Sequence, residues 1–214
     1  MSKSYQVLVV GGGAAGLATA ASLKKRDRSL EVAVVEPSDK HYYQPGWTMV
    51  GAGVFTKEDT IKDTDSIWPS DVIRIKDEVI KFDPKNNKVT LGNKTEVGYE
   101  MLVVASGLKL DWEAIEGLSE SLGENGVTSN YRYDLAPYTW ELVQEMNGKN
   151  AIFTQPPMPI KCAGAPQKAM YLSCDHWQKS GQLEGMNVSF CNAGPVLFGC
   201  ATYVPPLMKY VEKY

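Results

Sequence analysis

The stretch from residue 6 to residue 36 constrains the fold of this chain more than any other. The aliphatic run QVLVV at 6–10 leads directly into GGGAAG at 11–16, and an Ala-rich segment of helical composition follows. A second aliphatic run, 32–35, ends at the acid Glu36, about 20 residues after the last glycine. This order of strand, glycine turn, helix, strand and acid matches the dinucleotide-binding fingerprint. The sequence therefore predicts a Rossmann-like βαβ unit.

Each glycine of the turn has a separate expected role. Gly11 permits the sharp turn out of the strand, Gly13 leaves room for a pyrophosphate, and Gly16 lets the helix pack closely on the sheet. A diphosphate is expected on the free N–H groups at the helix start. The residues concerned are Gly11, Gly12, Gly13, Ala14, Ala15 and Gly16.

Glu36 is expected to accept hydrogen bonds from the ribose hydroxyls of an adenosine. An acid at this position disfavours a 2′-phosphate, so FAD or NAD is favoured over NADP. The alternative is a glycine-rich turn that binds no ligand.

Charge and hydropathy exclude few classes of function. The net charge of −3 gives no reason to propose a nucleic-acid partner. No apolar run approaches the ~18 residues of a membrane span. The chain enters its first strand almost at once, so we expect either a cytosolic protein or one whose leader is not included here.

The cysteines do not indicate a metal site. The four of them, Cys162, Cys174, Cys191 and Cys200, lie in the last quarter of the chain, and none forms a zinc-ligand spacing with His41 or His176. For all but Cys162, we expect small buried hydrophobic residues.

The middle of the chain predicts further elements of the first domain. Residues 37–55 are rich in Pro, Gly and aromatic residues and predict a loop over a ligand. Residues 71–82 alternate as one strand, 83–88 form a turn, and 88–91 begin a returning strand. Residues 99–107 predict a buried strand that stops at small residues. A hairpin inserted in this way is typical of three-layer flavoprotein domains.

A change of composition near residues 116–126 predicts the boundary between a first domain, 1–116, and a second, 117–214. The second begins with a helix whose apolar face is formed by Leu135, Tyr138, Leu142 and Met146. Strands at 150–154 and 187–191 flank a helix after residue 165. The predicted fold class is α/β, with an incomplete second βαβ domain. A sheet of two strands is rarely stable alone, so we expect a fragment of a longer protein or a shortened isoform.

Several strings of residues carry a family resemblance: GGGAAG at 11–16, EPSDKHYYQPGWTMVGAG at 36–53, VVASGLKLDW at 103–112 and IKCAGAPQKAMYL at 160–172. With these strings the chain resembles the eukaryotic, mitochondrial type of sulfide:quinone oxidoreductase, in the superfamily of flavoproteins with two dinucleotide-binding domains. The resemblance extends from residue 5 to about residue 210.

The resemblance implies FAD as the cofactor, with its diphosphate on residues 11–16 and its adenosine ribose on Glu36. Gln44 would lie near the flavin, and Val79 would contact the adenine side through its backbone. Cys162 would be one of two redox cysteines on the flavin face. The residues implied to close over the cofactor are Ala105, Ser106 and Gly107.

The implied reaction oxidises hydrogen sulfide through a cysteine persulfide and FAD. Electrons pass to ubiquinone, and sulfur passes to glutathione or sulfite. The implied location is the mitochondrial inner membrane, reached through a carboxy-terminal part that lies beyond this sequence. The implied partner cysteine also lies beyond residue 214, so we do not expect this chain alone to turn over sulfide.

The residues around Cys162 support a reactive thiol independently. Lys161 places a cation beside it, the small residues 163–165 leave room for a reactant, and Pro166 suits a helix first turn with exposed N–H groups. All three features favour the thiolate. A structural cysteine in a turn is the alternative.

The turn after the last predicted strand, NAGPVLFG at 192–199, lacks a second glycine fingerprint. Pro195, Val196 and Leu197 stand where a pyrophosphate needs an open backbone, which disfavours NAD(P)H as the electron donor. Two other functions stay open: a catalytically inactive isoform that binds FAD or a partner, and an NAD(P)H-dependent flavin reductase such as a type II NADH dehydrogenase.

Overall fold

The computed structural model describes residues 3–214, which form two compact units. The first unit comprises the chain up to Tyr43 together with Ile61–Asp111, and the second comprises Gln44–Thr60 and Trp112–Tyr214. The segment 44–60 belongs to the second unit because Trp47 and Val50 are buried in one cluster with Ala136. The domain boundaries expected from the sequence, 1–116 and 117–214, remain a prediction.

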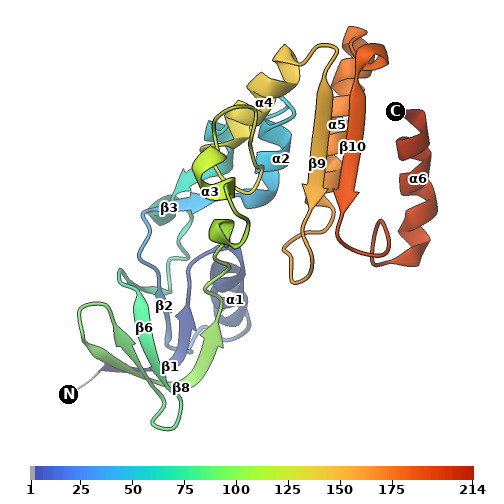
Figure 1. The fold of residues 1–214 in the computed structure, drawn as a ribbon. Coiled ribbons are helices and arrows are strands. Elements are labelled where there is room, and N and C mark those ends of the chain that lie inside the picture. The colour runs from blue at the N-terminus through green and yellow to red at the C-terminus, as the bar shows by residue number, and fades with distance from the viewer. Residues whose placement is uncertain (1–2) are drawn as a thin grey trace. The chain divides into compact units, whose positions relative to one another are not determined.

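Six strands form the main sheet of the first unit, in the order β5-β2-β1-β8-β7-β6. Figure 1 labels β1, β2, β6 and β8 of this sheet. The bounds of the six strands are β1 Lys3–Val10, β2 Val32–Val35, β5 Ile73–Ile75, β6 Val79–Asp83, β7 Lys88–Leu91 and β8 Glu96–Val104. The strands β5, β2, β1 and β8 are parallel, whereas β6 and β7 pair antiparallel as a hairpin. Helix α1, Ala14–Arg26, connects β1 to β2. The predicted βαβ unit with an inserted hairpin is therefore confirmed.

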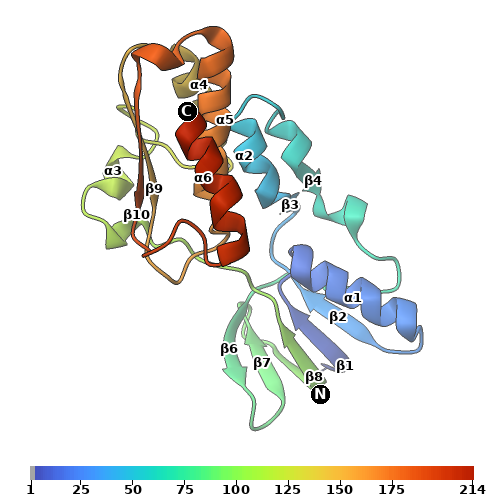
Figure 2. The ribbon, with the colours of Figure 1, turned by 90° about the vertical axis from the view of Figure 1, so that its right-hand side faces the viewer.

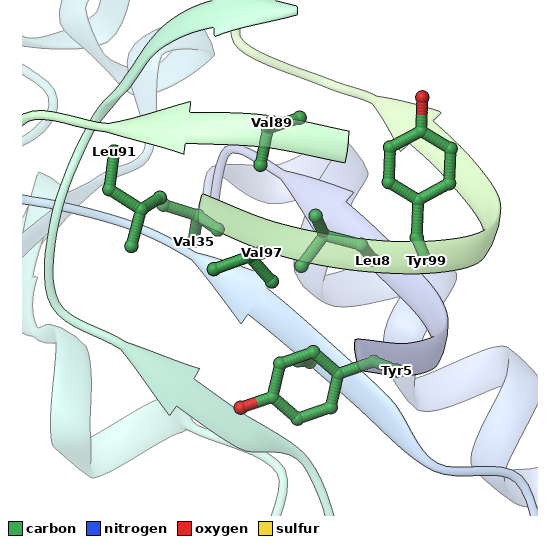
Figure 3. Packing of buried hydrophobic residues seen from close by; sticks show 8 residues of the cluster. Tyr5, Leu8, Val35, Val89, Leu91, Val97 and Tyr99 are labelled. Atoms are coloured by element: carbon green, nitrogen blue, oxygen red, sulfur yellow. The ribbon is translucent and has the colours of Figure 1, made fainter. Parts of the chain in front are cut away.

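The sheet has a separate core on each face. On one face, Ala20 of α1 packs with Val9 of β1 and Val34 of β2, and Figure 2 shows α1 lying along these strands. On the other face, Leu8 and Val35 pack with Val89 and Leu91 of the hairpin (Figure 3). The unit therefore has three layers, with the parallel strands between α1 and the hairpin.

The connection between β5 and β6 shows why the hairpin covers a face. These strands stand at opposite edges of the sheet order, yet only residues 76–78 separate them. Six strands laid flat would span about 24 Å, whereas so short a connection reaches at most about 14 Å. The sheet therefore curls, and the hairpin folds back over the parallel strands.

Three predicted elements need correction. Residues 71–82 are not one strand, because the Asp77 carboxylate accepts the backbone N–H of Glu78 at 2.8 Å and of Gly92 at 3.2 Å, which ends β5 in a turn. The strand at 99–107 begins earlier, at Glu96, and its second half is partly exposed. The segment 37–55 is not only a loop, because it contains β3 (Lys40–Tyr42), a 3₁₀ turn (Gln44–Gly46) and α2 (Trp47–Val50).

The remaining short elements of this region are the 3₁₀ turns Glu58–Thr60 and Thr64–Ile67 and the strand β4. Strand β4, Ile61–Asp63, pairs antiparallel with β3.

The second unit contains the expected βαβ arrangement. Strands β9 (Asn150–Gln155) and β10 (Asn187–Asn192) pair in parallel, and α5 (Ala165–Ser180) connects them, as Figure 1 shows. The other elements are α3 Leu118–Ser121, α4 Ala136–Glu145, α6 Val204–Lys213 and the 3₁₀ turns Trp112–Ala114, Leu183–Gly185 and Ala201–Tyr203.

The core of the second unit forms between α4 and α5. Trp177 of α5 is 1% exposed and donates its indole N–H to the Val143 carbonyl at 2.8 Å. The buried residues of α4 are Ala136, Thr139 and Val143. The predicted apolar face through Tyr138 and Leu142 is therefore wrong, because the buried face is rotated around the helix axis by part of a turn. The side from which α5 packs on α4 cannot be predicted from periodicity alone. No helix within residues 3–214 is long and apolar enough to cross a membrane.

Candidate functional site

The carboxyl ends of three neighbouring parallel strands bring together the predicted nucleotide-binding residues of the first unit. The Gly11 N–H donates to the Val35 carbonyl at 2.9 Å, and the Ala105 N–H donates to the Val10 carbonyl at 2.7 Å. These bonds place the ends of β2, β1 and β8 side by side. Ligands of open α/β sheets bind at this edge.

Two of the glycines are required by the packing of the turn itself. Gly11 has φ +101°, a conformation that favours glycine, and a Cβ there would lie 2.4 Å from the Ala105 carbonyl oxygen. A Cβ on Gly16 would lie 1.8 Å from the Gly11 carbonyl oxygen. The predicted roles of Gly11 in the turn and Gly16 in close packing are consistent with these contacts.

Gly13 has different surroundings. It is exposed, its φ is an ordinary −70°, and a Cβ on it would meet no atom of the described chain within 4 Å. It also caps α1, in which the first helical bond runs from the Leu17 N–H to the Gly13 carbonyl at 3.0 Å. The N–H groups of Ala14 and Ala15 therefore have no partner inside the helix. Open space beside helix-start N–H groups fits an anionic diphosphate.

Glu36 is held in place before any ligand arrives. One carboxylate oxygen, Oε2, accepts the Gly12 N–H at 2.7 Å, and the other, Oε1, accepts the Ser38 N–H at 2.7 Å. A carboxylate has about four lone-pair sites, so each oxygen can still accept a hydroxyl. The Glu36 side chain is partly exposed, and the arrangement suits the two hydroxyls of a ribose.

Arg74, Asp39 and Lys76 form a charged network that supports the turn after Glu36. The Arg74 guanidinium donates to the Ser38 carbonyl at 2.8 Å and to the Asp39 carboxylate at 3.1 Å, and it lies 5.2 Å from the ring of Trp68. Lys76 donates to Asp39 at 2.6 Å, and this bond lowers the pKa of the Asp39 carboxyl. No sequence motif marks these residues, because their meeting depends on the pairing of β5 with β2.

The remaining expected residues of the first unit lie around the same edge. Val79 packs on the apolar cluster that contains Val35, the residue before Glu36. Ser106 and Gly107 follow β8 and are exposed. Gly107 has φ +76°, and a Cβ on it would meet no described atom within 4 Å. Space for a ligand is therefore present beside Gly107.

Cys162 and Gln44 lie in the second unit. Cys162 is exposed, is not part of a disulfide, and stands three residues before α5, where its carbonyl accepts the Ala165 N–H at 2.9 Å. The ammonium of Lys161 donates to the side-chain oxygen of Gln44. Burial lowers the pKa of Lys161. Two segments that the sequence marked separately, the 36–53 string and the 160–172 string, therefore meet here.

Tyr131 also contacts the Cys162 turn, although no sequence motif marks it. Its hydroxyl donates to the Lys161 carbonyl at 2.6 Å and to the Cys162 carbonyl at 3.2 Å. Burial raises the pKa of Tyr131 to about 12. A lone tyrosine in a region without a motif carries no signal that could have identified this contact.

The other cysteines correct one expectation. Cys174 is buried at 1% exposure, and burial raises the pKa of its thiol to about 11. Cys191 and Cys200 are exposed rather than buried. Cys191 lies on the outward side of β10, whose alternation leaves every second residue uncovered, and Cys200 lies in the turn before α6.

The turn after β10 is held by hydrogen bonds from one of its own side chains and from one side chain of α5. The Asn192 amide donates to the Val196 carbonyl at 2.7 Å and its oxygen accepts the Gly194 N–H at 3.0 Å. The Gln167 amide donates to the Leu197 carbonyl at 2.6 Å. Of the backbone N–H groups that a second pyrophosphate would use, that of Gly194 is therefore already bonded to a side chain.

Comparison with known proteins places the chain in a family. The profile of the family described as pyridine nucleotide-disulphide oxidoreductase matches residues 5–141. The chain is 41% identical to the mitochondrial sulfide:quinone oxidoreductase of Dictyostelium discoideum, over 97% of this chain and 45% of that protein. It is 40% identical to the mouse protein of the same name, over 98% of this chain and 46% of that protein.

A solved structure agrees in fold. The sulfide:quinone oxidoreductase of Aquifex aeolicus superposes with a TM-score of 0.79 at 22% identity, covering 99% of this chain and 49% of that chain. This chain spans about half the length of the curated relatives that it matches. The resemblance seen in the sequence is thus confirmed, and the chain belongs to the pyridine nucleotide-disulphide oxidoreductase family.

Proposed function

We propose that this chain carries the FAD-binding and sulfide-reacting part of a sulfide:quinone oxidoreductase. The proposal assigns the nucleotide to the first unit and the reactive thiol to the second. It rests on the similarity to the mitochondrial enzymes and on the chemistry of the residues described above.

The observation that carries the proposal is the contrast among the glycines of the first turn. Gly11 and Gly16 are required by contacts within the protein, whereas Gly13 faces open space beside the start of α1. The backbone conformation of the turn does not require a glycine at position 13, because its φ of −70° suits any residue. A diphosphate that approaches the backbone explains the missing side chain.

Glu36 favours the ribose of FAD over a 2′-phosphate. Its carboxylate is fixed by the Gly12 and Ser38 N–H groups, and a phosphate beside it would meet a negative charge. Gln44, Val79 and the segment 105–107 complete the proposed cofactor set. FAD, when bound, would accept two electrons from a thiolate and pass them to a quinone.

Cys162 is the proposed redox cysteine of this chain. Hydrosulfide attacks a disulfide between Cys162 and a second cysteine of the longer enzyme, and the S–S bond breaks. One sulfur keeps the new S–S bond as a persulfide, and the other leaves as a thiolate that holds the electron pair. The exposed position of Cys162 lets a small anion reach it.

We further propose ubiquinone as the electron acceptor, glutathione or sulfite as the sulfur acceptor, and the mitochondrial inner membrane as the site of action. These assignments follow the names of the relatives and the implied family chemistry. The turn at 192–199, which lacks a glycine fingerprint and whose Gly194 N–H is bonded to Asn192, disfavours the alternative of an NAD(P)H-dependent reductase.

The test compares Cys162→Ser with Cys200→Ser in the full-length protein. Cys162→Ser should abolish reduction of the flavin by sulfide while the yellow cofactor stays bound, and Cys200→Ser, which removes another exposed thiol, should behave as wild type. Sulfide turnover that survives in Cys162→Ser would contradict the assignment. Flavin bleaching by NADH but not by sulfide would instead favour the reductase alternative.

A further inference from the structure

The backbone of Cys162 adopts a conformation that side chains rarely take. Its φ is +56°, in the left-handed region. A residue with a Cβ is disfavoured there, and such conformations persist only when the surrounding structure enforces them. The enforcing contacts can be identified.

The two peptide groups that flank Cys162 are both held. Their carbonyls belong to Lys161 and Cys162, and rotation between these two peptide planes is what φ and ψ of residue 162 describe. The Tyr131 hydroxyl lies 2.6 Å from the first carbonyl oxygen and 3.2 Å from the second. The Ala165 N–H donates to the second at 2.9 Å. One hydroxyl therefore bridges both planes and resists rotation between them.

The Tyr131 hydroxyl is well placed to act as a donor. The Tyr131 backbone N–H donates to the Ser129 hydroxyl at 3.1 Å, which fixes the start of the side chain. Burial raises the pKa of Tyr131 to about 12, so the phenol keeps its proton at neutral pH. A carbonyl pair needs such a proton, because it can only accept.

We propose that Tyr131 is a positioning residue for Cys162: its hydroxyl holds both flanking peptide groups and so presents the thiol in one outward orientation. The proposal rests on the proposed function in one respect: it assumes that the Cys162 sulfur reacts, and such an attack requires a defined direction of approach. Its geometric part concerns only the turn and can be tested without cofactor or sulfide.

The four cysteines of the chain make the test internally controlled. Tyr131→Phe removes the hydroxyl and keeps the ring. The matched control is Tyr138→Phe, which removes a hydroxyl that accepts the Gly126 N–H at 3.1 Å, away from the Cys162 turn. The measurement is the rate of alkylation by iodoacetamide at each cysteine, resolved by peptide mass spectrometry.

Cys162 should be alkylated more slowly in Tyr131→Phe, relative to the exposed Cys191 and Cys200, because the turn relaxes away from the outward orientation. Loss of one neutral hydrogen bond changes the equilibrium constant between the outward and relaxed turns by about fivefold, so the relative rate should fall by a factor of up to about five. Tyr138→Phe should leave the ratio unchanged. A phenylalanine with a para-amino group at position 131 restores a donor and should restore the ratio.

Each result decides the proposal. An unchanged ratio in Tyr131→Phe, with Cys174 still unlabelled, would overturn it. Labelling of the buried Cys174 in Tyr131→Phe would show that this variant has lost its fold. The para-amino variant is then the deciding one. If its Cys174 stays protected but its Cys162 ratio is not restored to the wild-type value, the proposal is overturned. Because no sulfide is used, failure here leaves the Cys162→Ser test of function independent.

Discussion

Replacing Gly16 by alanine should destabilise the first unit clearly more than the same replacement at Gly13. Both glycines belong to the same turn and gain the same methyl group. A methyl on Gly16 would lie 1.8 Å from the Gly11 carbonyl oxygen, but a methyl on Gly13 meets no described atom within 4 Å. The two variants therefore separate packing against the protein from space reserved for a ligand.

The magnitude follows from two opposing effects. Alanine in a helix interior is favoured over glycine by about 1 kcal/mol. Relief of the clash at Gly16 requires the start of α1 to move by more than an ångström from the turn, and overpacking of this kind costs about 3 kcal/mol or more. The net loss for Gly16→Ala is about 2 kcal/mol. Gly13→Ala should cost no more than about 1 kcal/mol, because φ −70° suits alanine and the only loss is that alanine is a poorer N-cap than glycine.

Hydrogen exchange of the buried β1 amides, Val7 to Val10, measures the opening free energy of this unit separately from the other unit. A loss of about 2 kcal/mol corresponds to exchange about 30 times faster. Gly13→Val should exchange more slowly than Gly16→Ala and yet fail to bind FAD. Equal protection in Gly16→Ala and Gly13→Ala would refute the packing argument, and an unchanged flavin spectrum in Gly13→Val would refute the proposed diphosphate position.

Three further predictions concern single side chains. Glu36→Gln should weaken FAD binding about tenfold to a hundredfold in a fluorescence titration, because it removes a charged acceptor that is held by two N–H groups. Trp177→Phe should lower the stability of the second unit by about 2 to 4 kcal/mol in urea unfolding, since it opens a cavity and leaves the Val143 carbonyl without its donor; Trp112→Phe, at a more exposed site, is the control. The raised pKa of Tyr131 means that its neutral form stabilises the fold: this contribution is complete below pH 10 and is lost as the pH rises toward about 12. The urea midpoint should fall over that window less steeply in Tyr131→Phe than in wild type.

The sequence by itself determined the elements whose signals are local. The glycine turn, the helix after it and the acid Glu36 follow one another within a single βαβ unit, so their spacing was enough to predict their arrangement. The hairpin at 83–91 was likewise marked by its own turn residues. The βαβ pair of the second unit followed from alternating strand and helix composition.

Only the tertiary structure decided contacts between segments that are distant in the sequence. The end of β5 could not be predicted, because it depends on Asp77 accepting N–H groups from the far side of the hairpin. The support of the Glu36 turn by Arg74, the meeting of Gln44 with Lys161, and the hold of Tyr131 on Cys162 depend in the same way on pairing and packing.

The glycines of the first turn show both sources of information. The sequence predicted that Gly11, Gly13 and Gly16 matter, since the fingerprint gives each a role. The structure distinguished them: Gly11 and Gly16 face atoms of the chain, and Gly13 faces open space. The physical reason is that the effect of adding a side chain at a glycine depends on the atoms that surround it. Folding brings those atoms together from distant parts of the sequence.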